Sequence, residues 1–237
     1  MKTTCSPAKV LASVTAMMLA ASLAGCDAAA NALEITEPAP GTGASSTIDP
    51  ATAANALEQL ERIPVKGRAP KTGYSRDEFG PAWADVDRNG CDTRNDILAR
   101  DLTNETFKPG TRSCVVMTGT LADRYTGTTI RFTRGQDTSS DVQIDHIVPL
   151  SDAWQKGAQQ LTVDQRRDLA NDPQNLMAAD GPTNAAKGDK DAATWLPPNK
   201  AFRCEYVARQ TAVKAKYSLW TTQAEHDAIA GILEGCA

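Results

Sequence analysis

Four polar residues between positions 143 and 191 carry side chains that could hydrolyse a phosphodiester together. Asp145 and His146 adjoin in QIDHIVPLSDAW, Asn175 lies in NDPQNLM, and Asn184 lies in GPTNAAKGDKD, where Lys187 follows it. The chain contains only two histidines, so finding one of them in this stretch is informative. A carboxylate, an imidazole and two carboxamides beside a lysine are the groups needed to cut a phosphodiester with one hard metal ion.

The chemistry of hydrolysis assigns a role to each group. A neutral imidazole accepts a proton near pH 7, so His146 is the predicted general base that activates water. Asp145 and Asn184 offer hard oxygen ligands, which favours Mg²⁺ over Zn²⁺ and leaves Mn²⁺ open. Neighbouring residues on a strand point to opposite faces, so Asp145 and His146 reach one phosphate only if the strand ends or bulges there. Pro149 is consistent with such an end.

The elements that must position these residues can be read from apolar periodicity, turn residues and helix caps. A short strand is expected to carry Val142 and Ile144 into the Asp145-His146 pair. The pattern as a whole predicts an α+β fold, with a small antiparallel hairpin and a helix core surrounded by helices. The other expected elements are helices over 91–102, 151–161, 162–169, 199–217 and 222–233, a short helix from 183, and strands over 114–121 and 128–133.

The start of the chain predicts export. Lys2 and Lys9 precede an apolar stretch too short to span a bilayer, which is typical of a secretory signal peptide over residues 1–25. The LAGC string ending at Cys26 resembles the lipobox of bacterial lipoproteins and implies lipidation of Cys26; an ordinary signal peptide is the alternative. Residues 26–60 are expected to be a disordered tether, with a short helix at 53–63, and residues 61–237 the folded domain. The predicted location is the cell envelope outside the cytoplasm, with a lipid anchor in the membrane.

Cysteine usage agrees with export. Four cysteines lie in the predicted domain, and in an exported protein they are expected to form two disulfides, for which three pairings exist. A zinc site is the alternative, but it would need CxxC-type spacing, which is absent. We favour Cys91–Cys114 and Cys204–Cys236, because each pair lies within one local segment.

The charge of the predicted domain is close to zero. From residue 61 onward the chain has 23 Lys and Arg residues against 24 Asp and Glu residues. This balance argues against a tight, nonspecific coat on nucleic acid and permits a local basic groove. Arg124, Arg131 and Arg134 flank the expected hairpin and could line a DNA path, although solvated strand charges are an equal alternative. We expect a monomer.

The stretch from residue 142 to 191 resembles the HNH endonucleases, the ββα-metal nucleases. DHIVP at 145–149 is typical of the first strand of that family, and Asn175 and Asn184 fit its second and third signature positions, with Asn in place of the final His. The cysteines, the DRYTG turn and the segment WLPPNKAFRCEYVARQTAVKAKY extend the likeness over about residues 61–237. This wider likeness is to exported bacterial HNH proteins related to the C-terminal nuclease domain of GmrSD-type restriction enzymes.

The resemblance implies a ββα-metal core and DNA as the substrate, with RNA not excluded. It implies that Asn175 holds the connecting loop and helps to orient His146, while Asp145 and Asn184 bind the metal. Lys187 is the candidate for contacting a substrate phosphate, and Lys190 is a weaker one.

Each of these residues also has a structural interpretation. His146 could be a satisfied strand-end histidine, Asn175 a turn former, Asn184 a helix-start residue and Lys187 a solvated charge. The remaining polar residues, His226, Asp92, Arg94 and Asp96, are expected to be structural. The sequence therefore predicts an exported, membrane-tethered, metal-dependent DNA endonuclease. The alternatives are a surface nucleic-acid-binding lipoprotein whose nuclease site has decayed, and a purely structural envelope lipoprotein.

Overall fold

The computed structural model describes residues 48–236. The predicted signal peptide, the lipidation site Cys26 and most of the predicted tether lie outside the described residues. Within the described part, no helix combines the length and the apolar character needed to span a bilayer.

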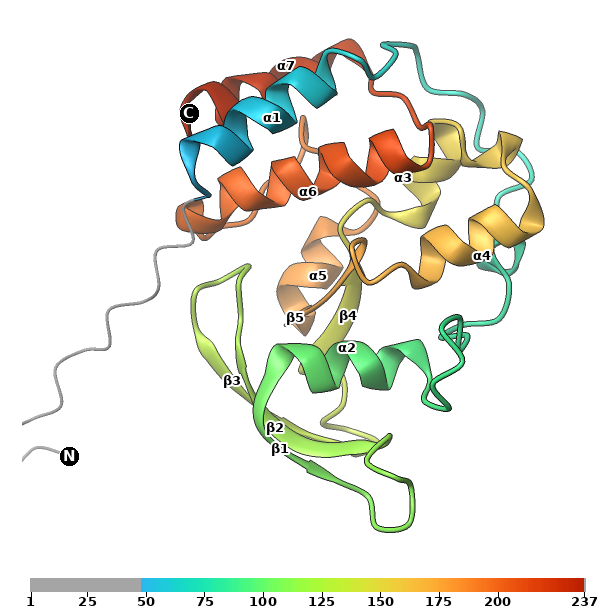
Figure 1. Ribbon diagram of the computed structural model, residues 1–237, viewed down its shortest axis with the longest axis vertical. Helices are drawn as coiled ribbons and strands as arrows, with labels where there is room; N and C mark the ends of the chain where they lie inside the picture. Colours follow the sequence, from blue (N-terminus) through green and yellow to red (C-terminus); the bar gives the residue numbers. More distant parts are fainter. Residues whose placement is uncertain (1–47, 237) are drawn as a thin grey trace, which may run out of the picture. The chain divides into compact units, whose positions relative to one another are not determined.

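Helices α1 (Pro50–Leu60), α6 (Arg203–Lys216) and α7 (Gln223–Glu234) pack against one another and form the upper part of Figure 1. The Asp49 side chain accepts a hydrogen bond from the backbone of Thr52 and caps α1, and a proline occupies the first helical position. Ala53 and Leu60 are fully buried against the other two helices. The folded part therefore includes residues 50–60, which the sequence placed in the tether.

A three-stranded antiparallel sheet of β1 (Leu102–Phe107), β2 (Val116–Ala122) and β3 (Thr129–Thr133) lies at the other end of Figure 1. Helix α2 (Thr93–Asp101) covers it with Ile97 and Leu98, which are buried in an apolar cluster with residues of β2 and β3. The predicted helix and the β2–β3 hairpin are confirmed. Strand β1 was not predicted, because LTNETF has little apolar alternation. The strand is also irregular, with a positive φ of 53° at Asn104.

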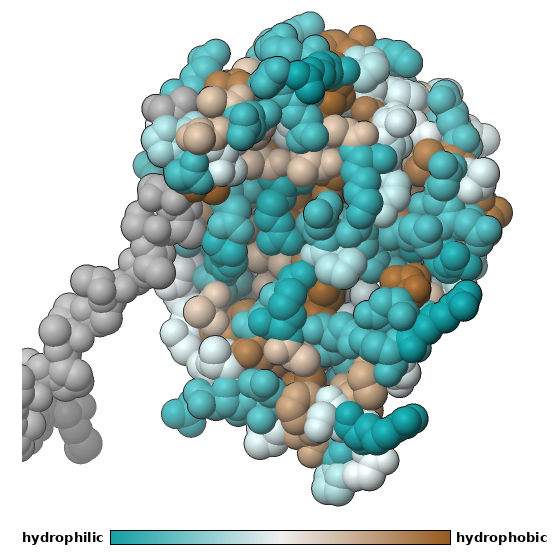
Figure 2. Space-filling view, viewed as in Figure 1, coloured by the Kyte–Doolittle hydropathy of each residue, from teal (hydrophilic) through white to brown (hydrophobic). Residues whose placement is uncertain are grey.

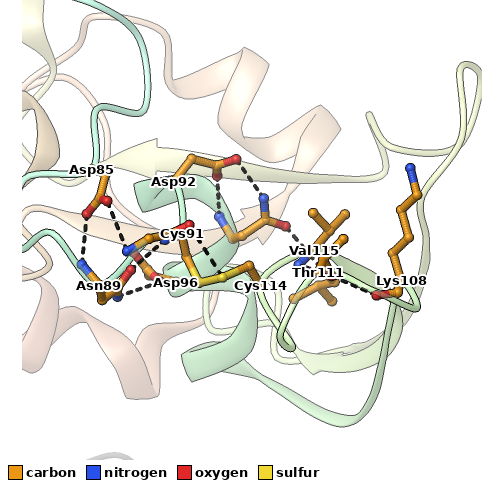
Figure 3. The surroundings of a disulfide bond; sticks show 12 residues. Asp85, Asn89, Cys91, Asp92, Asp96, Lys108, Thr111, Cys114 and Val115 are labelled. Carbon is orange, nitrogen blue, oxygen red and sulfur yellow. Dashed lines mark hydrogen bonds between the residues drawn. A yellow bond between two sulfur atoms is a disulfide. The ribbon is translucent and has the colours of Figure 1, made fainter.

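The first disulfide, Cys91–Cys114, joins the start of α2 to the loop before β2 (Figure 3). Asp92 caps α2 by accepting from the backbone of Asn95 at 2.8 Å. The Asn89 side chain donates to Asp96 at 3.1 Å, so the acidic residues beside this disulfide fix the loop. The second disulfide, Cys204–Cys236, ties α6 to the end of α7. Both predicted pairings are confirmed.

A ββα unit lies between the sheet and the helix layer (Figure 1). Strand β4 (Val142–His146) pairs antiparallel with β5 (Leu176–Asp180), and α5 (Gly181–Lys187) follows β5 directly. Gly181 is required at the junction, since a Cβ there would lie 2.0 Å from the carbonyl oxygen of Ser140. The ββα arrangement that the family resemblance implies is therefore present, although strand β5 itself was not predicted from the residues.

A second helical group covers the exit of β4. It consists of α3 (Leu150–Gln155), α4 (Val163–Asn171) and the short 3₁₀ helices at Arg76–Phe79 and Ala158–Gln160. A further 3₁₀ helix, Lys200–Phe202, leads into α6 and packs with the first helical layer. The helix expected over 162–169 is present, and it begins with a capping box in which Thr162 and Gln165 exchange side-chain to backbone hydrogen bonds. The apolar residues of this group, among them Phe79, Leu150, Trp154 and Leu169, form a buried cluster that Val213 of α6 completes.

A buried network of charges connects α3, α6 and α7. The Lys156 ammonium contacts Asp152 at 2.8 Å, Asp191 at 2.8 Å and Glu225 at 2.6 Å, and all four side chains are 3% exposed or less. Lys214 is fully buried and reaches Glu225 at 3.0 Å. At the start of α7, Thr222 therefore caps the helix by accepting from the backbone of Glu225, while the Glu225 side chain turns inward to the two lysines.

The visible face of the described residues is mostly hydrophilic, with hydrophobic side chains in small separate groups (Figure 2). The large apolar residues that are exposed, Val65, Val86 and Val163, are single positions in different segments. Scattered residues of this kind are normal on a protein surface. The features that point to a function are therefore polar and lie around the end of β4.

Candidate functional site

The candidate site lies where β4 ends. The strand stops at His146, as expected from Pro149, so Asp145 and His146 both line one pocket of about 230 Å³ although they are adjacent in sequence. Asn184 of α5 lines the same pocket, together with Ser151 of α3. Three of the four residues singled out in the sequence thus meet at one cavity.

The His146 imidazole is held in one orientation. Its Nε2 lies 2.8 Å from the carbonyl oxygen of Ala170, which can only accept a hydrogen bond, so Nε2 carries the proton and Nδ1 keeps its lone pair. The Trp83 ring stacks on the imidazole with an interplanar angle of 13°. Burial lowers the pKa of His146 to about 4, against the opposing effects of the Ala170 hydrogen bond and the Asp145 charge. At neutral pH His146 is therefore an uncharged proton acceptor.

The Asp145 carboxylate is buried and strongly bonded. Lys187 of α5 donates to both of its oxygens, at 2.9 and 2.8 Å, and the Tyr125 hydroxyl donates to Oδ2. Burial and the Asp145 charge raise the pKa of Tyr125 well above its usual value, so this hydroxyl stays protonated. Lys187 also donates to the His146 carbonyl oxygen at 2.6 Å. The ion pair therefore fixes α5 against the end of β4.

Asn175 ties the chain that follows His146 to the end of α4. Its side chain is fully buried, accepts from the backbone of Val148 at 2.8 Å and donates to the carbonyl oxygens of Val148 and Leu169. Its own carbonyl oxygen accepts from Ile147 at 2.8 Å. Leu169 precedes the residue whose carbonyl binds His146. This geometry suits the loop-holding and orienting role that the sequence assigned to Asn175.

Asn184 presents an oxygen to the pocket. Its amide nitrogen donates to the Gln143 side chain at 2.9 Å, which identifies the nitrogen and the oxygen of the carboxamide. The oxygen has no hydrogen-bond donor among residues 48–236. Asn184 is half-buried, on a helix whose N-terminus is capped by Asp180. Its oxygen is thus free to bind a cation or a water molecule.

The donor set fits a weakly held, hydrated magnesium ion better than a transition metal. Asp145 Oδ1 accepts only one hydrogen bond, and each carboxylate oxygen has a second lone pair, so it can still serve as a ligand beside Asn184. In the described part of the chain no three His, Cys, Asp or Glu side chains are grouped to hold a metal. Magnesium commonly binds through one or two protein oxygens and keeps several waters, so Asp145 and Asn184 are the residues that could hold it.

The other charged residues considered from the sequence are either paired with protein groups or exposed. Lys187 is fully buried against Asp145, so a phosphate contact would require its ammonium to leave that carboxylate. Lys190 is exposed and donates to the Ala186 carbonyl oxygen. His226 is 16% exposed on α7 and lies beside Glu61 and Asp227. Two of the hairpin arginines have protein partners, since Arg124 pairs with Glu205 and Arg134 bonds Asn95.

Three residues at the site were not found from the sequence. Tyr125, from the turn before β3, bonds Asp145 across 20 residues of chain. Trp83 and Arg76 come from a Gly- and Pro-rich segment with no apolar period; Trp83 stacks on His146, and both residues line a second cavity of about 80 Å³ beside it. Only the DRYTG turn carried a signal, and it pointed to a hairpin and not to a site.

Comparison with known proteins identifies the family of the chain. The family described as "GmrSD restriction endonucleases, C-terminal domain" matches residues 92–232. A protein of Arthroderma benhamiae named "Uncharacterized secreted protein" is 37% identical over 187 residues, which cover 78% of this chain and 86% of that protein. No solved structure matches the chain significantly. The matched range includes β4, β5 and α5 and excludes Arg76 and Trp83.

Proposed function

Because the chain belongs to the family of GmrSD restriction endonuclease C-terminal domains, we propose that it is an HNH-type endonuclease that hydrolyses DNA phosphodiester bonds with one divalent ion. The observation that carries the proposal is the hydrogen bond from His146 to the Ala170 carbonyl oxygen. It leaves an uncharged, oriented imidazole with a free lone pair in the pocket shared by Asp145 and Asn184.

In the proposed reaction, a water oxygen forms a bond to phosphorus while its proton passes to Nδ1 of His146. The bond from phosphorus to the leaving sugar oxygen breaks, and that oxygen takes a proton from solvent. Asp145 and Asn184 would hold Mg²⁺ or Mn²⁺, which when bound supplies positive charge for the nonbridging and leaving oxygens. The Ala170 carbonyl and the Trp83 ring keep the imidazole in place, and Asn175 ties the chain after His146 to Leu169, the neighbour of Ala170.

The test is a plasmid-nicking assay with the full, oxidised chain. Supercoiled DNA is incubated with Mg²⁺, with Mn²⁺ and with EDTA, and His146→Ala is compared with His226→Ala, a change of the chain's other histidine far from the pocket. We expect nicking with Mg²⁺ that EDTA abolishes, and a rate for His146→Ala lower by about 10²- to 10⁴-fold, the usual contribution of a general base. His226→Ala should nick like the wild type.

Different failures point to different conclusions. No nicking with either ion would contradict the enzyme proposal, and DNA binding without nicking would support a decayed site. Nicking that survives both EDTA and His146→Ala would contradict the mechanism instead. Cleavage of an RNA strand of the same sequence at an equal rate would remove the restriction to DNA.

We also propose that the chain acts outside the cytoplasm, tethered through lipidated Cys26. Two disulfides in the described part suit an oxidising compartment, and the Arthroderma benhamiae relative is named as secreted. Labelling cells with a radioactive fatty acid should mark the wild type and not Cys26→Ser. Release of unlabelled wild type into the medium would contradict the tether and leave export intact.

A further inference from the structure

Arg76 occupies a position beside His146 that the proposed reaction has not used. It is the first residue of the 3₁₀ helix Arg76–Phe79 and is exposed. It lines both cavities next to His146: the one that contains Asp145 and Asn184, and the smaller one that contains Trp83. The only other residues common to both linings are His146 itself and Leu150. Arg76 therefore stands where the two cavities meet.

The other cations near this point are already neutralised. Lys187 is buried against Asp145, and Lys71 contacts Asp189 at 3.1 Å on the rim of the larger cavity. Arg166 contacts Glu78 at 3.2 Å. The Arg76 guanidinium forms no ion pair or hydrogen bond with any residue from 48 to 236. Its charge is nevertheless close enough to His146 to contribute to the lowering of that residue's pKa, after the larger effect of burial.

The short helix that carries Arg76 is firmly attached to the core. Phe79 is 1% exposed and packs edge-on against Tyr74, with Trp154 beside it. Arg166 of α4 donates to the carbonyl oxygen of Glu78 at 2.7 Å. The backbone of Arg76 is thus fixed while its guanidinium remains free. Such an arrangement suits a group that awaits a partner from solution, since little backbone entropy is lost on binding.

We infer that Arg76 binds a phosphate of the nucleic-acid backbone at the junction of the two cavities, beside His146. A guanidinium can donate two parallel hydrogen bonds to phosphate oxygens, and it stays charged at any pH at which the fold survives. The inference rests on the proposed nuclease function. It also replaces Lys187, the lysine suggested by the sequence, with a cation that is accessible. Because Arg76 precedes residue 92, this contact comes from outside the region that matches the family.

The test compares Arg76→Ala and Arg76→Lys with Arg62→Ala, which removes one exposed arginine from the end of α1. Binding of a fluorescent 20-base-pair duplex to the full, oxidised chain is measured in EDTA at several salt concentrations. Loss of one phosphate contact should lower the slope of log affinity against log salt by about 0.9 for Arg76→Ala. Arg76→Lys should keep the slope with a weaker affinity, because lysine keeps the charge and loses the fork. Arg62→Ala should match the wild type.

Nicking in Mg²⁺ is measured with the same proteins, and we expect kcat/KM to fall at least tenfold for Arg76→Ala. If Arg76→Ala keeps both the wild-type slope and the wild-type kcat/KM, the inference is overturned and the nuclease proposal stands. If the wild type does not nick but the slope still falls for Arg76→Ala, the phosphate contact stands and the nuclease proposal fails. A wild type that neither binds nor nicks DNA at low salt overturns both. Should Arg76→Ala fail to fold, Arg76→Gln decides by the same two readouts.

Discussion

Replacing Lys187 by methionine should destabilise the protein strongly, because it leaves a buried carboxylate without its cation. The Lys187 side chain is 0% exposed and that of Asp145 is 6% exposed, and the two lie 2.8 Å apart. Breaking a buried pair of this kind costs about 3 to 5 kcal/mol in the free energy of unfolding. For a folded part of this size, that loss corresponds to a fall in Tm of roughly 6 to 20 °C. Methionine has a similar length, so the loss reports the charge more than the volume.

The assay is urea unfolding at pH 7 of four proteins: the wild type, Lys187→Met, Asp145→Asn, and the double variant. Asp145→Asn removes the charge that Lys187 neutralises, so the double variant should be less destabilised than the two single effects predict together. A coupling free energy of about 2 kcal/mol or more is expected for partners in direct contact. Lys190→Met is the matched control, because Lys190 is exposed and bonds only the Ala186 carbonyl oxygen. It should change the free energy of unfolding by about 0.5 kcal/mol or less.

The reasoning is refuted if Lys187→Met lowers the free energy of unfolding by less than about 1 kcal/mol, or if the double variant shows no coupling. The first result would mean that Asp145 reaches water or another cation. Added Mg²⁺ distinguishes an Asp145 that reaches water from one that already has another cation, because removing the Lys187 ammonium leaves the carboxylate open to a competing cation. Millimolar Mg²⁺ should then raise the Tm of Lys187→Met more than that of the wild type, by ligand linkage.

Three further predictions concern the protonation of His146, the hydrogen bonds of Asn175 and the disulfides. Since the pKa of His146 in the folded protein is about 4, kcat/KM should rise with pH through about 4 and be level at pH 6; a midpoint at or above 6 contradicts this. The pKa of His146 in the folded protein lies below the ordinary value of 6.5. The contribution of this shift to the free energy of unfolding is therefore fully present above pH 6.5 and is lost as the pH falls through 4. The loss is about 3 kcal/mol, and His146→Asn should abolish it in pH-dependent urea unfolding. Asn175→Ala leaves several buried backbone groups unpaired, so it should lower the free energy of unfolding by about 2 to 4 kcal/mol. It should also lower kcat without changing the affinity for DNA, and an unchanged kcat contradicts the orienting role. The oxidised chain from residue 48 onward should show no free thiol after unfolding. The double change Cys204→Ser with Cys236→Ser should lower the free energy of unfolding, measured by calorimetry, by about 3 to 4 kcal/mol. A loss near zero would mean that the α6–α7 contact does not need the disulfide.

Local signals in the sequence were enough to find the centre of the site. Asp145 and His146 are adjacent, the strand end is consistent with Pro149, and Asn184 lies in the short helix expected from residue 183. That helix begins two residues earlier than expected, at Gly181, with Asp180 as its cap. The disulfide pairings were also predictable, because each pair spans a short segment. These features share one property: the residues that decide them are neighbours in the chain, where periodicity, caps and turns have their effect.

The partners of those residues were not predictable, because they come from distant segments. The bond from Lys187 to Asp145 spans 42 residues, and no spacing rule distinguishes it from a solvated lysine. Trp83 approaches His146 from a segment without apolar period, held there by tertiary contacts. Strand β5 has only five residues, nearly all apolar, and its LMAAD sequence could equally have been a buried helical turn. Long-range packing decided each of these cases.

The buried charges behind the pocket explain how such distant segments are held in register. Pro149, Ser151 and Asp189 line the cavity, and the nearby Asp152 and Asp191 point the other way, into the network around Lys156. Each of these carboxylates also binds Arg68, from the segment that leads to Arg76.

Burial alone would lower the pKa of Lys214 in the same network, but Glu225 and Asp152 outweigh it and raise the pKa, so the charge is kept. A network of this kind contributes little net stability, and its members are costly to separate. It therefore penalises any packing in which α3, the loop after α5 and the arginine segment are not docked together. Those three segments line the pocket together with β4 and α5, so the same charges that add little to stability help to fix the geometry on which His146, Asn184 and Arg76 depend.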